Sequence, residues 1–195
     1  MYLSIEHKKP IGNGIITCFN KKQAIERSKS KKNYSFITEE TGIINNLDKD
    51  NFWIIDPIDG TTNFLHGIPH FAVSIAHIQR QEALATVVYD SIHDDLYWAE
   101  KGIGAFRNDR RIRVSQRRRI LDAVVGNYEI DKNDKNIHKY QNCVTQNAGI
   151  LRMLGSTSLD LAYVAAGWLD GFWSSTATPA DVMSGALLVQ EAGGF

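Results

Sequence analysis

The sequence predicts a layered α/β fold, in which an antiparallel sheet from the first half is followed by a smaller mixed sheet from the second half. Two patterns indicate this division. Short apolar segments recur between residues 71 and 107, separated by turn residues at the spacing of an antiparallel meander. From residue 123 onward, strand-like segments alternate with helical ones. With 195 residues, 43% of them hydrophobic, the chain is long enough for one domain with a substantial core.

The strands expected in the first half are short and rich in β-branched and aromatic residues. They are Ser35–Thr38, Trp53–Ile55, Phe71–Ile78, Leu84–Tyr89, Leu96–Ala99 and Ala105–Arg107. Residues 43–51 are polar and are expected to form a connection. Gly102 and Gly104 are interpreted as turn residues, because a phosphate-binding glycine motif needs a third glycine and a following helix.

In the second half, the expected elements alternate between helix and strand. They are a helix at Ile137–Gln146, a strand at Leu151–Leu154, a helix at Leu159–Ala166, a strand at Trp168–Trp173 and a final helix that Asp181 caps. Ser156 and Ser158 are interpreted first as caps of the Leu159–Ala166 helix and second as substrate contacts.

One stretch carries the strongest chemical signal. Trp53–Ile55 reads as a buried strand that breaks at Asp56-Pro57, because proline donates no ladder hydrogen bond and keeps the preceding residue extended. Asp59 follows in a turn, and Gly60–Thr62 reads as a helix start. The two carboxylates are suited to Mg²⁺, and the N–H groups of the helix start to a phosphate. A plain turn is the alternative, since aspartate, proline and glycine are common turn residues.

The segment D-P-I-D-G-T-T-N-F after W-I-I, with P-H-F-A-V-S-I-A at 69–76, resembles the signature of the inositol monophosphatase family. These proteins are Mg²⁺-dependent, lithium-sensitive phosphatases. The resemblance covers about residues 34–195 and implies a fold like those of inositol monophosphatase and fructose-1,6-bisphosphatase. We expect a single domain over 1–195, truncated at both ends and incomplete at the C-terminus. Its expected parts are a divergent segment 1–33, an antiparallel-sheet half 34–120 and a partial α/β half 121–195.

The resemblance also implies a two-metal site. Glu39, the first glutamate of T-E-E-T, is expected to hold one Mg²⁺ together with Asp56 and the carbonyl of Ile58. Asp56 is expected to bridge to a second Mg²⁺, completed by Asp59 and Asp181. Carboxylate and carbonyl oxygens are the ligands that Mg²⁺ prefers.

Phosphate and water are expected to bind beside the metals. The resemblance assigns the phosphate to the backbone N–H groups of Gly60 and Thr61, with Thr62 beside them. Relatives activate the attacking water through a threonine paired with the aspartate of a V-T-x-x-D motif. Thr61 matches the threonine, and I-T-C-F-N places Asn20 where the aspartate stands. An amide cannot take a proton, so turnover is expected to fall by about 10²–10⁴-fold while metal binding survives.

Two further departures concern the substrate. Ser174 stands where relatives carry a glutamate that contacts the sugar alcohol, and Ala180 replaces the tryptophan of W-D-x-x-[A/S]-G. The change at Ser174 weakens the case for inositol phosphate specifically. A sugar phosphate or a nucleotide stays open as substrate.

Charge and composition limit the kinds of binding partner that the sequence predicts. Lys plus Arg and Asp plus Glu each number 22, so no net charge attracts nucleic acid or an anionic membrane. The arginine cluster within Arg110–Arg119 is interpreted as a solvated hairpin edge, with an RNA or acidic protein partner left open. Cys18 and Cys143 form no disulfide framework. No apolar run approaches the ~20 residues of a membrane span and no signal peptide is seen, so a cytoplasmic protein is expected.

The sequence therefore favours one function and leaves a second one open. The leading one is Mg²⁺-dependent hydrolysis of a small phosphorylated polyol, such as inositol monophosphate, by a metal-activated water. The alternative is a catalytically impaired relative, or the product of a gene remnant, that binds metal, phosphate, RNA or protein. Because lost flanking helices would expose apolar faces, a homodimer is also considered.

Overall fold

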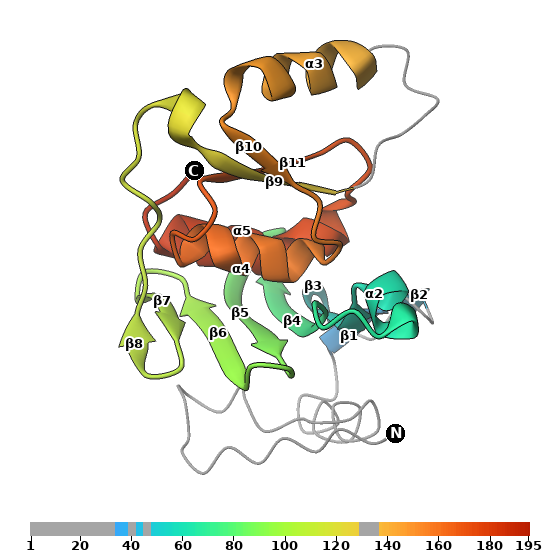
Figure 1. Cartoon of the computed structure of the whole chain (residues 1–195). Helices are drawn as coiled ribbons and strands as arrows, with labels where there is room; N and C mark the ends of the chain where they lie inside the picture. Colours follow the sequence, from blue (N-terminus) through green and yellow to red (C-terminus); the bar gives the residue numbers. More distant parts are fainter. Residues whose placement is uncertain (1–33, 39–41, 45–47, 129–136) are drawn as a thin grey trace.

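A computed structural model describes residues 34–38, 42–44, 48–128 and 137–195 (Figure 1). Two predicted site residues, Asn20 and Glu39, lie outside these ranges. In the described residues an eight-stranded sheet has the order β2-β1-β3-β4-β5-β6-β7-β8, and a three-stranded sheet has the order β10-β9-β11. The layered α/β class is confirmed.

The larger sheet is a meander with one parallel pair. Its strands are β1 (Tyr34–Thr38), β2 (Gly42–Ile44), β3 (Asp48–Asp59), β4 (Ala72–Gln79), β5 (Glu82–Asp90), β6 (Asp95–Glu100), β7 (Gly104–Arg107) and β8 (Arg110–Arg111). From β3 to β8 each strand pairs antiparallel with the next, as predicted. However, β1 pairs parallel with β3, because β2 turns back along the outer edge of β1 before the chain enters β3. Much of 43–51, expected as a connection, belongs to β2 and β3.

The smaller sheet is parallel in the described residues, whereas the sequence predicted a mixed one. Its strands are β9 (Val124–Tyr128), β10 (Ile150–Arg152) and β11 (Gly171–Ser174), and both β10 and β11 pair parallel with β9. The reason lies in the connections: α3 (Ile137–Asn147) and α4 (Thr157–Ala165) each carry the chain back to the edge where the preceding strand began.

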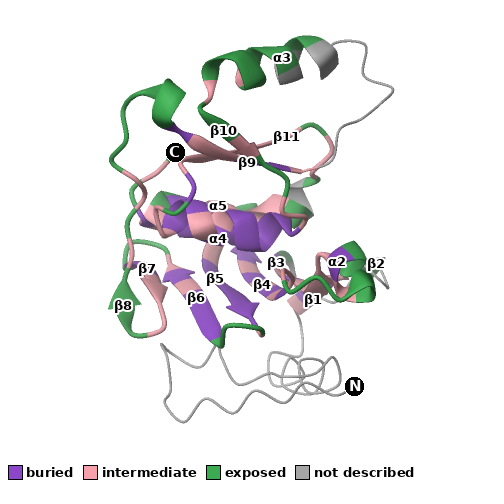
Figure 2. Ribbon diagram, in the orientation of Figure 1, coloured by how far each residue is buried: buried purple, intermediate pink, exposed green. Residues whose placement is uncertain are grey.

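Helices α4 and α5 (Pro179–Glu191) form a layer between the two sheets, and the buried residues concentrate there and on the strands that face it (Figure 2). Leu159 of α4 and Leu188 of α5 are fully buried and share one core with Val88 and Tyr97 of the larger sheet. A short helix, α2 (Thr61–His66), leaves the end of β3. Among the described residues, no helix has the length and apolar character needed to cross a membrane.

Close packing of α4 against α5 depends on Gly185. A Cβ atom added there would lie 2.3 Å from Cβ of Leu161. We expect Gly185→Ala to lower the free energy of unfolding by about 1–3 kcal/mol through overpacking, although alanine is the better helix former. Urea unfolding measures the change. Gly171→Ala is the control, because an added Cβ there meets nothing within 4 Å. Equal unfolding midpoints for the two variants would contradict this packing explanation.

Candidate active site

The carboxyl end of β3 carries a bulge. Three steps along β3, from Asp56 to Asp59, correspond to two steps along β4, from Ser74 to Ala72. Pro57 lies inside this interval and has no N–H group for the ladder. An extra residue on one strand bends that strand and re-aims its side chains. The sequence predicted that the strand would end at Asp56-Pro57. It continues instead to Asp59, so Asp56 lies near the end of the strand as expected, whereas Asp59, expected in a turn, is its last residue.

A tight turn links this bulge to α2. Oδ1 of Asp56 accepts a hydrogen bond from the Ile58 N–H group at 2.9 Å, and Oγ1 of Thr61 donates to the Ile58 carbonyl at 2.9 Å. Gly60 has a φ of 91°, and a Cβ atom there would lie 3.0 Å from the Gly155 carbonyl. Both the left-handed backbone and the close approach therefore require glycine. The predicted helix start after Gly60 is confirmed, and Thr61 and Thr62 are exposed.

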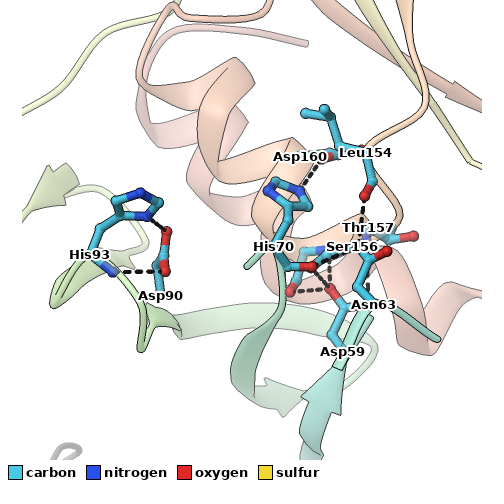
Figure 3. A network of polar contacts seen from close by, with 10 residues as sticks. Asp59, Asn63, His70, Asp90, His93, Leu154, Ser156, Thr157 and Asp160 are labelled. Atoms are coloured by element: carbon cyan, nitrogen blue, oxygen red, sulfur yellow. Dashed lines mark hydrogen bonds and ion pairs between the residues drawn. The ribbon is translucent and has the colours of Figure 1, made fainter. Parts of the chain in front are cut away.

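Asp59 caps the first turn of α4 (Figure 3). Its Oδ2 atom accepts hydrogen bonds from Oγ of Ser156 at 2.6 Å, and from N and Oγ of Ser158 at 2.7 and 2.5 Å. Its Oδ1 atom lies 3.3 Å from N of Thr157. Ser156 does occupy the N-cap position, but its own side chain makes no capping bond. The cap predicted from the serines is thus supplied by a carboxylate of β3, whose negative charge suits a helix N-terminus.

Asp181 lies in the first turn of α5 but is not its N-cap, so that prediction was wrong. Thr178 is the N-cap, and the two residues form a capping box: Oδ2 of Asp181 accepts from N of Thr178 at 2.7 Å. One turn further along, Oγ of Ser184 lies 3.2 Å from Oγ of Ser74, which is opposite Asp56 in the sheet. Helix α5, which carries Asp181, therefore contacts β4 at the position that pairs with Asp56.

Ser174 ends β11 and shapes the connection to α5. Its hydroxyl oxygen accepts hydrogen bonds from the N–H groups of Thr176 and Ala177 at 3.2 and 3.1 Å. The predicted substrate position is thus engaged in holding the loop that leads to Asp181.

The donor set suits a hard divalent cation in its chemistry, because three carboxylates and a peptide carbonyl are oxygen ligands. Asp56 and Asp59 come from β3 and Asp181 from α5. Within the described ranges, however, no three His, Cys, Asp or Glu side chains gather closely enough to hold a metal ion. Glu39, the fourth predicted carboxylate, lies outside those ranges. The described residues thus include suitable ligand types, but these side chains do not by themselves form a complete metal site.

A buried polar network beneath the turn was not predicted from the sequence (Figure 3). Nε2 of His70 lies 2.8 Å from Oδ1 of Asp160, which is fully buried in α4. Nδ2 of Asn63 donates to the carbonyls of His70 and Leu154, both at 2.7 Å. Burial raises the pKa of the Asp160 carboxyl, and its hydrogen bond with His70 opposes part of that rise. The network ties α2, the start of β4 and α4 to one another.

The fold is therefore that of a layered α/β protein in which two carboxylates lie at the end of a strand and one of them, Asp59, caps a helix packed between the sheets. A model of the inositol monophosphatase family matches residues 15–195. The chain therefore belongs to the inositol monophosphatase family, and the resemblance found in the sequence is confirmed.

Individual relatives agree with this assignment. The chain is 45% identical over 174 residues to an inositol-1-monophosphatase of Mesorhizobium japonicum, covering 87% of this chain and 65% of that protein. It is 44% identical over 175 residues to the Nus factor SuhB of Pseudomonas aeruginosa, covering 86% and 64%. The chain thus spans just under two thirds of the length of these curated relatives.

Solved structures show the same fold. The extragenic suppressor protein suhB from Bartonella henselae superposes with a TM-score of 0.81 at 45% identity, covering 88% of this chain and 67% of that one. An inositol monophosphatase from Anabaena gives a TM-score of 0.81 at 34% identity, covering 88% and 70%.

Proposed function

We propose that the protein is a Mg²⁺-dependent phosphatase that hydrolyses the monoester of a small phosphorylated polyol, such as inositol monophosphate. One observation carries this proposal: Asp56 and Asp59 lie at the end of β3, and α5, the helix that carries Asp181, contacts β4 opposite Asp56. The family, and the activity in the names of relatives such as the Mesorhizobium japonicum protein, support the same conclusion. A sugar phosphate or nucleotide stays open as substrate.

The metal ligands proposed are those that the sequence predicted. Glu39, Asp56 and the carbonyl of Ile58 would hold one Mg²⁺, and Asp56, Asp59 and Asp181 a second. When bound, the ions supply a nucleophilic water at neutral pH and neutralise charge on the reacting oxygens.

The remaining roles belong to the turn after β3. The backbone N–H groups of Gly60 and Thr61, with Thr62 beside them, would orient the phosphate. The Thr61 hydroxyl donates its one hydrogen bond to the Ile58 carbonyl, so its oxygen can accept a hydrogen bond from the attacking water. Asn20 would orient that hydroxyl or the water but could not remove a proton.

Restoring a carboxylate at position 20 is expected to increase turnover. Asn20→Asp would supply the missing general base, which is typically worth about 10²–10⁴-fold. The measurement is phosphate release from inositol 1-phosphate, and from an aryl phosphate, at saturating Mg²⁺. Asn142→Asp makes the same substitution at an exposed position of α3 and serves as control. Equal turnover for Asn20→Asp and the wild type would contradict the role given to Asn20.

A second function is favoured by the relatives named Nus factor SuhB. In this alternative a catalytically impaired scaffold binds RNA or protein through Arg110–Arg119, whose arginines are exposed. Arg117 and Arg119 already pair with Asp170 and Asp122, so Arg110, Arg113 and Arg118 are the better positions to test. Salt-sensitive RNA binding that is lost on their replacement by glutamine, without phosphatase activity, would favour the scaffold. Homodimer formation and a cytoplasmic location stay predictions.

A further inference from the structure

We infer that Ser156 and Ser158 are positioning residues that restrict Asp59 to ligating a metal ion through one oxygen, and that they thereby select Mg²⁺ over Ca²⁺. The inference rests on the proposed function, because it assigns Asp59 to the metal site. It concerns residues that do not themselves ligate the ion.

The two oxygens of Asp59 have unequal surroundings. Oδ2 accepts three hydrogen bonds, of 2.5, 2.6 and 2.7 Å, from the two serines. Oδ1 has one contact, at 3.3 Å from N of Thr157. A carboxylate oxygen offers about two lone-pair sites, so the donors occupy Oδ2 while Oδ1 keeps capacity for a ligand.

The donors are held rigidly. Ser156 is 0% exposed and Ser158 is 1% exposed, so neither side chain can turn toward solvent. The turn that carries them is anchored from below, because Asp160 contacts His70 and Asn63 holds the carbonyl of Leu154. To present both oxygens to one ion, Asp59 would have to give up all three short hydrogen bonds.

This restriction matters because Mg²⁺ and Ca²⁺ use carboxylates differently. Mg²⁺ requires near-ideal octahedral geometry with ligands at about 2.0–2.1 Å. Ca²⁺ accepts 6–8 oxygens at about 2.3–2.6 Å and is often held by carboxylates through both oxygens. A carboxylate limited to one oxygen therefore favours Mg²⁺, and releasing its second oxygen favours Ca²⁺.

The test is thermal melting of the full chain, titrated separately with MgCl₂ and CaCl₂. The double variant Ser156→Ala/Ser158→Ala removes both hydroxyls, so Oδ2 keeps only the hydrogen bond from the backbone N–H group of Ser158. Outer-shell substitutions typically cost about 10–100-fold in metal affinity. We expect the apparent Mg²⁺ affinity to fall by about tenfold, while the Ca²⁺ affinity stays the same or rises. Ser158→Thr, which keeps the hydroxyl, should retain the preference for Mg²⁺, and Ser91→Ala in the β5–β6 turn should not change it.

The readout is the ratio of the two affinities, which a general loss of stability does not move. Equal losses for Mg²⁺ and Ca²⁺ in Ser156→Ala/Ser158→Ala would overturn the inference while leaving the proposed function intact. If this double variant does not fold, Ser156→Cys/Ser158→Cys keeps side chains of similar shape that donate only weakly, and it gives the same test. A wild type with no Mg²⁺-dependent shift at all would overturn the proposed function as well, so the two failures are distinguishable.

Discussion

Replacing Asp56 with asparagine is expected to lower phosphatase turnover by about 10³-fold or more. Asp56 is the residue proposed to contact both metal ions, and an amide lacks its charge and one of its two ligand oxygens. Metal ions contribute several kcal/mol of charge stabilisation in the transition state, and each 1.36 kcal/mol is a factor of ten in rate. Phosphate release from inositol 1-phosphate at a range of Mg²⁺ concentrations measures the loss.

The structure also indicates why this variant should fold. The contact of Asp56 that shapes the turn is its acceptance of the Ile58 N–H group through Oδ1, and the amide oxygen of asparagine can accept the same bond. This contact should therefore survive in the variant. Asp109→Asn, at an exposed position between β7 and β8, makes the same chemical change away from the site and should keep full turnover. Full turnover in Asp56→Asn would contradict the proposed ligand set.

Removing the partner of Asp160 is expected to be strongly destabilising. His70→Phe keeps a ring of similar size beside Tyr163, whose centroid lies 5.5 Å from that of His70, but it deletes the hydrogen bond to Asp160. In the described part of the chain, the other oxygen of Asp160 already has no hydrogen-bond partner. Leaving a buried charge without its partner typically costs about 3–5 kcal/mol, which urea unfolding at pH 7 would measure.

The loss of folding stability in His70→Phe should increase with pH. Burial raises the pKa of Asp160 above its ordinary 3.8, so the folded state holds this proton more tightly than the unfolded state. The destabilisation that comes from ionising buried Asp160 is therefore absent below the ordinary pKa. It grows as pH rises toward the folded-state pKa and is complete above that value. Losing His70 raises that pKa further, so the deficit of His70→Phe should be larger at pH 7 than near pH 4. Adding Asp160→Asn should recover much of it, whereas a pH-independent deficit without recovery would contradict this explanation.

The strands of the meander could be predicted because their signals are local. Alternating apolar residues in β4 and turn residues between β5 and β6 identify these elements without knowledge of the rest of the chain. Strand direction could not be predicted in the same way. The parallel pairs β1–β3 and β9–β11 follow from the paths of the connections between strands, which composition does not encode.

In the candidate site, too, the features with local sequence signals could be predicted and the tertiary contacts could not. Pro57 and Gly60 mark the turn locally, and so Asp56 could be placed at the end of a strand and Asp59 shortly after it. The donors to Asp59 stand 97 to 99 residues away, and His70 and Asp160 stand 90 apart. No periodic pattern or spacing links such distant residues before the chain is folded. The tertiary contacts that hold the carboxylates were therefore visible only in the structure.

The central claim is that the end of β3, together with the start of α5, provides a Mg²⁺ site. The most direct test is the melting temperature of the wild type and of Asp56→Asn, each with and without Mg²⁺. A ligand at 100 times its dissociation constant stabilises a fold by about 2.7 kcal/mol, which raises the melting temperature of a chain this size by roughly 5–10 °C. We expect that rise in the wild type and none in Asp56→Asn. An equal rise in both, or no rise in the wild type, would contradict the claim.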